Sequence, residues 1–302
     1  MAVPSRISDV LFRRDMVGPS FVKFAATVTG MVLIEKVFME FVLPHLAGEL
    51  EDIFARHGKI QALFLLSAAN SVVTFWGFGA LMALPAFVGA SRWKIQAGKS
   101  LDLQMLQSSM PLIVFNWLLG IILLPLLFAH FLPESFFDWR SPPSTQTLVR
   151  DAVVWLAIEE VWFFYSHRWM HMNKQLYAAV HKMHHKWTAP ISFTAIYCHP
   201  FEHLVSNLTP LVLGPLVCGS HLAAISIFSF LGVLHTMAVH SGYWFCDDNG
   251  MHDEHHAKFN VNFGVLGVMD SLYGTYQLPG GPSQSTPGAA SKAGERLGEK
   301  VE

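Results

Sequence analysis

The chain has 302 residues, of which 52% are hydrophobic and 14% are charged, and its formal net charge is -2. Soluble proteins carry about 25% charged residues, so this composition excludes an ordinary soluble domain. The near-neutral charge and the scattered Lys and Arg also exclude nucleic acid as a partner, because no basic stripe is available for a phosphate backbone. We therefore expect an all-α, polytopic membrane protein.

Two long stretches without Asp, Glu, Lys or Arg, residues 60–91 and 103–133, are the strongest candidates for membrane spans. Each exceeds the roughly 20 apolar residues that cross a bilayer. Weaker candidates are residues 21–43, interrupted by four charged side chains, and residues 152–165, interrupted by Glu159 and Glu160. Together these segments predict about four transmembrane helices, with residues 1–148 as an N-terminal membrane scaffold.

Histidines are distributed unevenly along the chain. Only His45, His57 and His130 precede residue 167, and the other thirteen of the sixteen lie between residues 167 and 256. A purely structural use of histidine would not segregate in this way. We therefore predict that residues 149–278 form a catalytic domain.

Within that domain, residues 204–246 again lack formal charge, but they are short for two full spans and are punctuated by Pro and Gly. We predict a hairpin that dips into the membrane and returns, so that histidines before and after it can meet in a helical cap. Residues 279–302 are rich in Pro, Gly, Ser and Ala, and are predicted to be a disordered tail.

Three histidine clusters share one spacing. They read HRWMH, HKMHH and HDEHH, with offsets of three and four residues that return to the same face of a helix. Neutral imidazole is a common ligand of Zn, Cu, Fe and Ni, and eight histidines exceed the needs of one site. We predict a centre of two metal ions held by the catalytic histidines, with Asp253 and Glu254 facing away from it. The eight ligands are His167, His171, His181, His184, His185, His252, His255 and His256.

The order of these clusters in a polytopic membrane protein resembles the fatty acid hydroxylase and sterol desaturase superfamily, whose histidines hold a pair of irons. The resemblance runs from about residue 159 to 276 and includes IEEVWFFYSHRWMH, HKMHHKWTAPI, YCHPFEHLVSN, HSGY, HDEHH and MDSLYGT. Methylsterol monooxygenases, which oxidise methyl groups on a sterol, are close relatives within it. One departure is Glu159-Glu160 where the family often has Glu-Asp, and since a carboxylate remains we expect its role to be kept.

The resemblance also implies roles for further histidines. His240 of HSGY matches a family histidine and is expected to bind metal. His235 and His199 are additional candidates, although His199 also fits a residue that hydrogen-bonds a ligand. A structural role is expected for His203, and a place at the membrane edge for His221.

By resemblance, the protein is a monooxygenase that uses O₂ and two Fe ions to oxidise a C–H bond of a lipid. A sterol is favoured over a fatty acyl chain as that lipid. Electrons would come from NAD(P)H through cytochrome b5 and its reductase, because no dinucleotide-binding motif occurs in this chain. Such donors work on the cytosolic face, so the histidines are expected on the cytosolic side, and the family implies the endoplasmic reticulum membrane. Purified protein is expected to take up Zn in place of Fe, because Zn often binds divalent-metal sites more tightly.

Three alternatives remain open at this point. The chain is a fatty acid hydroxylase, a fatty aldehyde decarbonylase of the same superfamily, or a catalytically silent metal-binding membrane protein. The intact set of eight histidines argues against the silent protein, and a bacterial plasma membrane is an alternative location.

Overall fold

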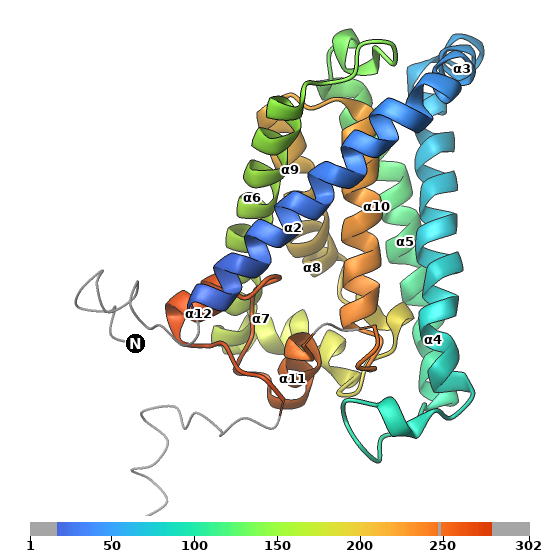
Figure 1. Cartoon of the computed structure of the whole chain (residues 1–302). Coiled ribbons are helices and arrows are strands. Elements are labelled where there is room, and N and C mark those ends of the chain that lie inside the picture. Colours follow the sequence, from blue (N-terminus) through green and yellow to red (C-terminus); the bar gives the residue numbers. More distant parts are fainter. Residues whose placement is uncertain (1–16, 247–248, 280–302) are drawn as a thin grey trace, which may run out of the picture.

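The computed structural model describes residues 17–246 and 249–279, and the regular elements in these ranges are helices (Figure 1). One isolated β-bridge joins Lys94 to Tyr243. Four helical runs are long and apolar enough to cross a membrane: residues 17–87, 103–131, 200–218 and 222–239. The prediction of an all-α polytopic membrane protein is confirmed for the described residues, and the predicted tail lies largely outside them.

The first helical run turns back on itself. It contains α2 (Val17–Val37), a π-helical segment (Phe38–Val42), α3 (Leu43–Ser71), a second π-helical segment (Val72–Phe78) and α4 (Gly79–Phe87). Gly58 within α3 has φ 73°, a left-handed conformation that breaks a right-handed helix. The limb after Gly58 descends beside the bundle to α4 (Figure 1), and it contains most of the predicted span 60–91.

Two long helices follow, and each begins with a side-chain cap. The Asp102 carboxylate accepts the backbone N–H of Met105 at 2.8 Å and starts α5 (Leu103–Phe131), the predicted span 103–133. The Ser144 hydroxyl accepts the N–H of Thr147 at 3.2 Å and starts α6 (Thr145–Met172). The boundary at residue 148 therefore falls inside the first turns of α6.

The predicted membrane hairpin is a pair of helical arms. The first arm contains α8 (Pro200–Glu202), a π-helical segment (His203–Leu208) and α9 (Thr209–Cys218), and the second is α10 (Leu222–Val239). Gly219, with φ 60°, ends the first arm. The arms are 19 and 18 residues long, because the first one already begins at Pro200, before the uncharged stretch.

The long limbs alternate in direction, and the short elements gather at one end of the bundle, at the bottom of Figure 1. Here α6 ends with two of the histidines and α10 ends just before His240. We call this end the histidine cap. Its short helices are α7 (Lys174–Ala179), the 3₁₀ helices His181–Lys186 and Ser192–Ile196, α11 (Met251–Lys258) and α12 (Val268–Tyr273).

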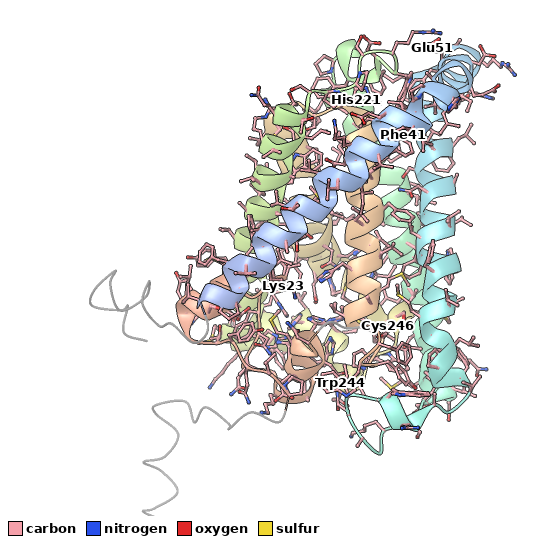
Figure 2. The ribbon with its side chains drawn as sticks, in the orientation of Figure 1. Lys23, Phe41, Glu51, His221, Trp244 and Cys246 are labelled. Atoms are coloured by element: carbon pink, nitrogen blue, oxygen red, sulfur yellow. The ribbon has the colours of Figure 1, made fainter. Side chains whose placement is uncertain are left out.

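The opposite end of the bundle is polar, as Figure 2 shows around Glu51 and His221. There Arg140 donates from Nε to the Glu51 carboxylate at 2.7 Å. His221 lies 2.9 Å through Nε2 from the carbonyl oxygen of Asp138. Between the two ends, large apolar side chains such as Phe41 face outward, with 66% of that residue exposed. An apolar outer surface between two polar ends is the arrangement that a bilayer requires.

The core joins the predicted scaffold to the predicted catalytic domain. Trp155 of α6 is fully buried against Phe228 of α10, with ring centroids 4.8 Å apart. A Cβ atom at Gly214 of α9 would lie 3.0 Å from the Trp155 Cα, so only glycine permits α9 to approach this closely. The same hydrophobic cluster includes Met31 and Leu43 from the N-terminal run. This shared packing holds α6 and α10, which carry histidines at their ends, in fixed relation.

Candidate metal centre

Nine histidine side chains meet at the histidine cap and form two clusters. The nitrogen atoms that each cluster offers lie within 4.8 Å of one another. All eight histidines predicted from the three motifs take part, together with His240. The five-histidine cluster contains His167, His171, His181, His185 and His255, and the four-histidine cluster contains His184, His240, His252 and His256.

The clusters do not follow the motifs as the helical offsets predicted. HKMHH lies in a six-residue 3₁₀ helix, and its three rings do not converge on one point. His181 and His185 enter the five-histidine cluster, whereas His184 enters the other. HDEHH divides in the reverse sense, with His252 and His256 in the four-histidine cluster and His255 in the other. These two motifs therefore each serve both clusters, whereas both histidines of HRWMH lie in the five-histidine cluster.

The distances between nitrogen atoms fit ligands around an ion. In the five-histidine cluster, the Nε2 atoms of His171 and His185 are each within 3.0 Å of the His181 Nε2. In the four-histidine cluster, the His252 Nε2 lies 2.9 Å from that of His240 and 3.2 Å from that of His256. An ion about 2.1 Å from two nitrogens at a right angle would hold them about 3.0 Å apart.

Backbone carbonyls fix the orientation of five of these rings. A neutral imidazole that donates from Nδ1 carries an unprotonated Nε2, so each Nε2 lone pair points into its cluster. Lone pairs that converge in this way repel one another, and a cation between them removes the repulsion. The Nδ1 contacts are His167 to Phe263 (2.9 Å), His184 to Tyr197 (3.2 Å), His240 to Thr236 (2.7 Å), His255 to Val261 (2.6 Å) and His256 to Trp187 (2.9 Å).

A buried carboxyl group faces a sixth ring. Glu202 Oε1 lies 2.9 Å from the Nδ1 of His181, and both residues are buried. Carboxylates commonly hold the outer nitrogen of a metal-binding histidine in this way. We did not predict Glu202 from the sequence, although it is a charged residue within the HPFEH motif, just before an uncharged segment of more than forty residues.

Two further carboxylates hold the loop after α11. Glu160 accepts the backbone N–H groups of Val265, Leu266 and Met269 at 2.7 to 3.0 Å. Asp270 accepts those of Phe263 and Gly264 at 2.8 and 2.7 Å. The loop they fix supplies the carbonyls of Val261 and Phe263, which orient His255 and His167. The carboxylate expected at the Glu159-Glu160 pair thus acts through the loop.

Burial keeps the clustered rings neutral. Loss of hydration, strengthened by the neighbouring histidines, lowers the pKa of His171 to about 2 and that of His240 to about 3. Burial alone lowers the pKa of His184 to about 4. The same cause lowers the pKa values of the other six rings. At neutral pH all nine imidazoles are therefore in the form that binds metal ions.

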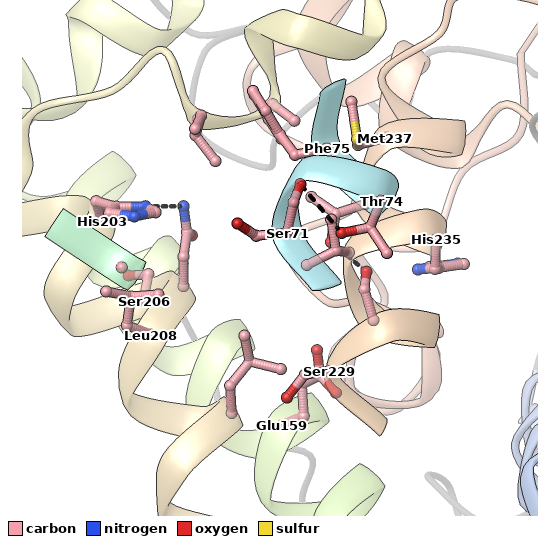
Figure 3. A pocket seen from close by; sticks show the side chains of 18 of the residues that line it. Ser71, Thr74, Phe75, Glu159, His203, Ser206, Leu208, Ser229, His235 and Met237 are labelled. Carbon is pink, nitrogen blue, oxygen red and sulfur yellow. Dashed lines mark hydrogen bonds between the residues drawn. The ribbon is translucent and has the colours of Figure 1, made fainter. Parts of the chain in front are cut away.

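The structure does not bring the remaining candidates into either cluster. His199 caps α8, where its Nδ1 accepts the N–H of Phe201 at 3.1 Å. His235 lies on α10 and lines a cavity, as Figure 3 shows. His203 accepts a hydrogen bond from the Asn207 amide at 3.3 Å. We leave these three out of the proposed ligand set.

An apolar cavity of about 250 Å³ extends from the clusters into the bundle, between α3, α5, α6, α9 and α10. Its wall includes His167 of the five-histidine cluster and three rings of the four-histidine cluster. Apolar side chains such as Leu63, Ile121 and Phe128 form much of the rest. Figure 3 shows polar residues among them, including Ser71 and Glu159. A lipid that entered this cavity would contact both the apolar wall and the histidines.

Comparison with known proteins points in the same direction. The family model for fatty acid hydroxylases matches residues 152–275. Fatty acid hydroxylase domain-containing protein 2 of Homo sapiens is 38% identical over 234 residues, which cover 72% of this chain and 68% of that protein.

Two enzymes are more distant relatives. A fatty acid hydroxylase of Mycosarcoma maydis is 29% identical, covering 74% of this chain and 59% of its own. Methylsterol monooxygenase 1 of Danio rerio is 28% identical, covering 61% of this chain and 68% of its own. No solved structure gives a significant match.

Proposed function

Because the chain belongs to the fatty acid hydroxylase family, we propose that it is a membrane di-iron monooxygenase that oxidises a C–H bond of a lipid, with a sterol as the preferred substrate. The observation that carries this proposal is the position of two histidine clusters at the base of an apolar cavity. The residues 149–278 would form the catalytic part, and residues 1–148 the scaffold that closes the cavity.

The residues present fit two iron ions. Nine neutral imidazoles without a thiolate suit divalent first-row metals and not an iron–sulfur cluster. Irons bound by the two clusters would supply the O₂-dependent redox chemistry that side-chain acids and bases lack. Overall, one oxygen atom enters the C–H bond as a hydroxyl group, and the other leaves as water after taking up two electrons and two protons. We propose NAD(P)H, through cytochrome b5 and its reductase, as the electron source.

The protein's own contribution is positioning. The carbonyls and Glu202 hold the rings in place, so that the ligand geometry is set before a substrate arrives. The cavity wall holds a substrate carbon beside the histidines and excludes water. Because the cavity lies within the apolar part of the bundle, the substrate would enter from the bilayer. We propose the endoplasmic reticulum membrane, with the histidine cap on the cytosolic side where the electron donors act.

Untargeted lipidomics on cells that lack the protein tests this proposal. Accumulation of methylated sterols, reversed by the wild-type gene and not by His184→Gln, is the expected result. Loss of hydroxylated fatty acids would identify a fatty acid hydroxylase instead, and loss of alkanes an aldehyde-cleaving enzyme. An unchanged lipidome together with stoichiometric metal would point to a catalytically silent protein.

A further inference from the structure

Asn116 lies midway along α5, and its side chain is fully buried in the cavity wall. Its amide nitrogen donates to two backbone carbonyls, Ile196 at 2.9 Å and Cys198 at 2.8 Å. These contacts determine which position of the amide is nitrogen and which is oxygen. A flipped amide would set its oxygen against two carbonyl oxygens and would lose both hydrogen bonds.

The amide oxygen of Asn116 is left as a buried acceptor. None of the described residues donates a hydrogen bond to it. Two other polar side chains of the wall are engaged within the protein: the Ser71 hydroxyl accepts the Trp117 indole N–H at 3.1 Å, and the Thr74 hydroxyl donates to the Asn70 carbonyl at 2.8 Å. An acceptor buried without a donor costs stability, so a donor that reaches it from the cavity gains affinity.

The residue that carries this acceptor is joined to the same loop as the four-histidine cluster. The amide of Asn116 contacts the carbonyl of Cys198, and the ring of His184 contacts that of Tyr197, the preceding residue. Both side chains are therefore tied to consecutive residues of one loop, and both line the same cavity. A group bound at the Asn116 oxygen would hold a nearby carbon beside His184.

We propose that the amide oxygen of Asn116 accepts a hydrogen bond from a hydroxyl group of the lipid substrate, carried close to the carbon that is oxidised. This inference rests on the proposed oxygenase function and narrows its substrate to hydroxylated lipids. The apolar wall packs against the hydrocarbon part of the lipid, and the amide oxygen accepts the hydrogen bond from its hydroxyl group. An ionised fatty acid has acceptors only, so the same oxygen disfavours it.

The test compares ligand pairs on metal-loaded, full-length protein in lipid nanodiscs. The first pair is a dimethylated sterol with its free hydroxyl group and the same sterol with hydrogen in its place. The second pair is a long-chain alcohol and the matching fatty acid. Equilibrium dissociation constants are measured for wild type, for Asn116→Leu and for Ser109→Ala. Ser109 is a matched control because it is buried on the same helix but does not line the cavity.

Wild type should bind the hydroxylated sterol about tenfold more tightly than its deoxy form, and Asn116→Leu should reduce this ratio to about one. Ser109→Ala should keep the wild-type ratio. A merely structural role of Asn116 would weaken both sterols equally and leave the ratio unchanged. The comparison of ratios also cancels the difference in solubility between the two sterols.

Equal affinity of wild type for both sterols, and for alcohol and acid, would overturn the inference and assign the Asn116 oxygen to a water molecule alone. This comparison needs no variant, so it decides the matter even if Asn116→Leu fails to fold. If Asn116→Leu changes the affinity ratio of the alcohol and the acid but not that of the two sterols, the substrate is not a sterol. Asn116 then still recognises the hydroxyl group of another lipid. If binding depends on Asn116 but no oxidised product forms under turnover conditions, the oxygenase proposal is wrong. The hydroxyl-binding site would then remain as the function of Asn116.

Discussion

His184 and His185 are consecutive in the chain, yet their rings belong to different clusters. The ring centroids are 5.6 Å apart, and the two side chains leave the 3₁₀ helix toward opposite groups of histidines. His252 and His255, which are close in α11, are divided in the same way. The same two short segments therefore hold both proposed ions. The ions cannot move apart without distortion of both segments.

The first prediction concerns His184. Replacing it with Gln removes one of four ligands from the four-histidine cluster, so bound metal should fall from about two ions per chain toward one, with turnover abolished. Lys182→Ala is the control, because Lys182 is exposed in the same segment. Metal content is measured by elemental analysis of purified protein. Full activity in His184→Gln, or equal losses in both variants, would contradict a ligand role.

The second prediction concerns Glu202. Glu202→Gln keeps the shape of the side chain but replaces the carboxyl group that faces His181 with an amide, so metal affinity should fall about 10–100-fold while the protein still folds. Chelator competition measures this affinity. The exposed Glu40, which pairs with Lys36 on the surface, provides Glu40→Gln as the control that should bind metal normally. Unchanged affinity in Glu202→Gln would show that the carboxylate does not orient the ring.

The third prediction contrasts two adjacent glutamates. Glu160→Gln places an amide N–H₂ among three backbone N–H groups, and each buried donor left without an acceptor costs about 1–3 kcal/mol. The variant should show a clearly lower thermal unfolding midpoint. Glu159→Gln should unfold like wild type, because Glu159 faces the cavity without a hydrogen bond to the described residues. Equal midpoints for both variants would mean that Glu160 does not hold the loop.

The fourth prediction concerns pH. The clustered histidines have pKa values below the usual 6.5. Below pH 6.5 these histidines therefore bind protons in the unfolded chain but stay neutral in the folded chain. Stability should therefore fall with pH from 6.5 down to about 4 for His184, by about 1.4 kcal/mol per pH unit for each such ring. The unfolding midpoint of chelator-treated protein, followed by tryptophan fluorescence, measures this loss. A midpoint independent of pH over this range would show that the rings are hydrated.

Local spacing predicts the eight motif histidines because the HxxHH and HxxxH patterns lie within a few residues of chain. It does not predict the division of His184 from His185, because that depends on where α10 and α11 bring their own rings. The sequence does not predict the roles of Glu202, the loop carbonyls and Asn116 for the same reason. Asn116 meets its partners across about eighty residues, and no periodicity in α5 marks one buried amide among apolar neighbours.

The sharing of both clusters between two motifs also sets an order of events during synthesis. His252, His255 and His256 are the last histidines of the chain, and each cluster needs at least one of them. Neither proposed site is complete while the ribosome is still making α10, because both clusters lack residues of α11 at that stage. Neither proposed ion can then have its full ligand set until α11 has been made, so a chain stalled before α11 would offer at most four histidines to one ion and two to the other.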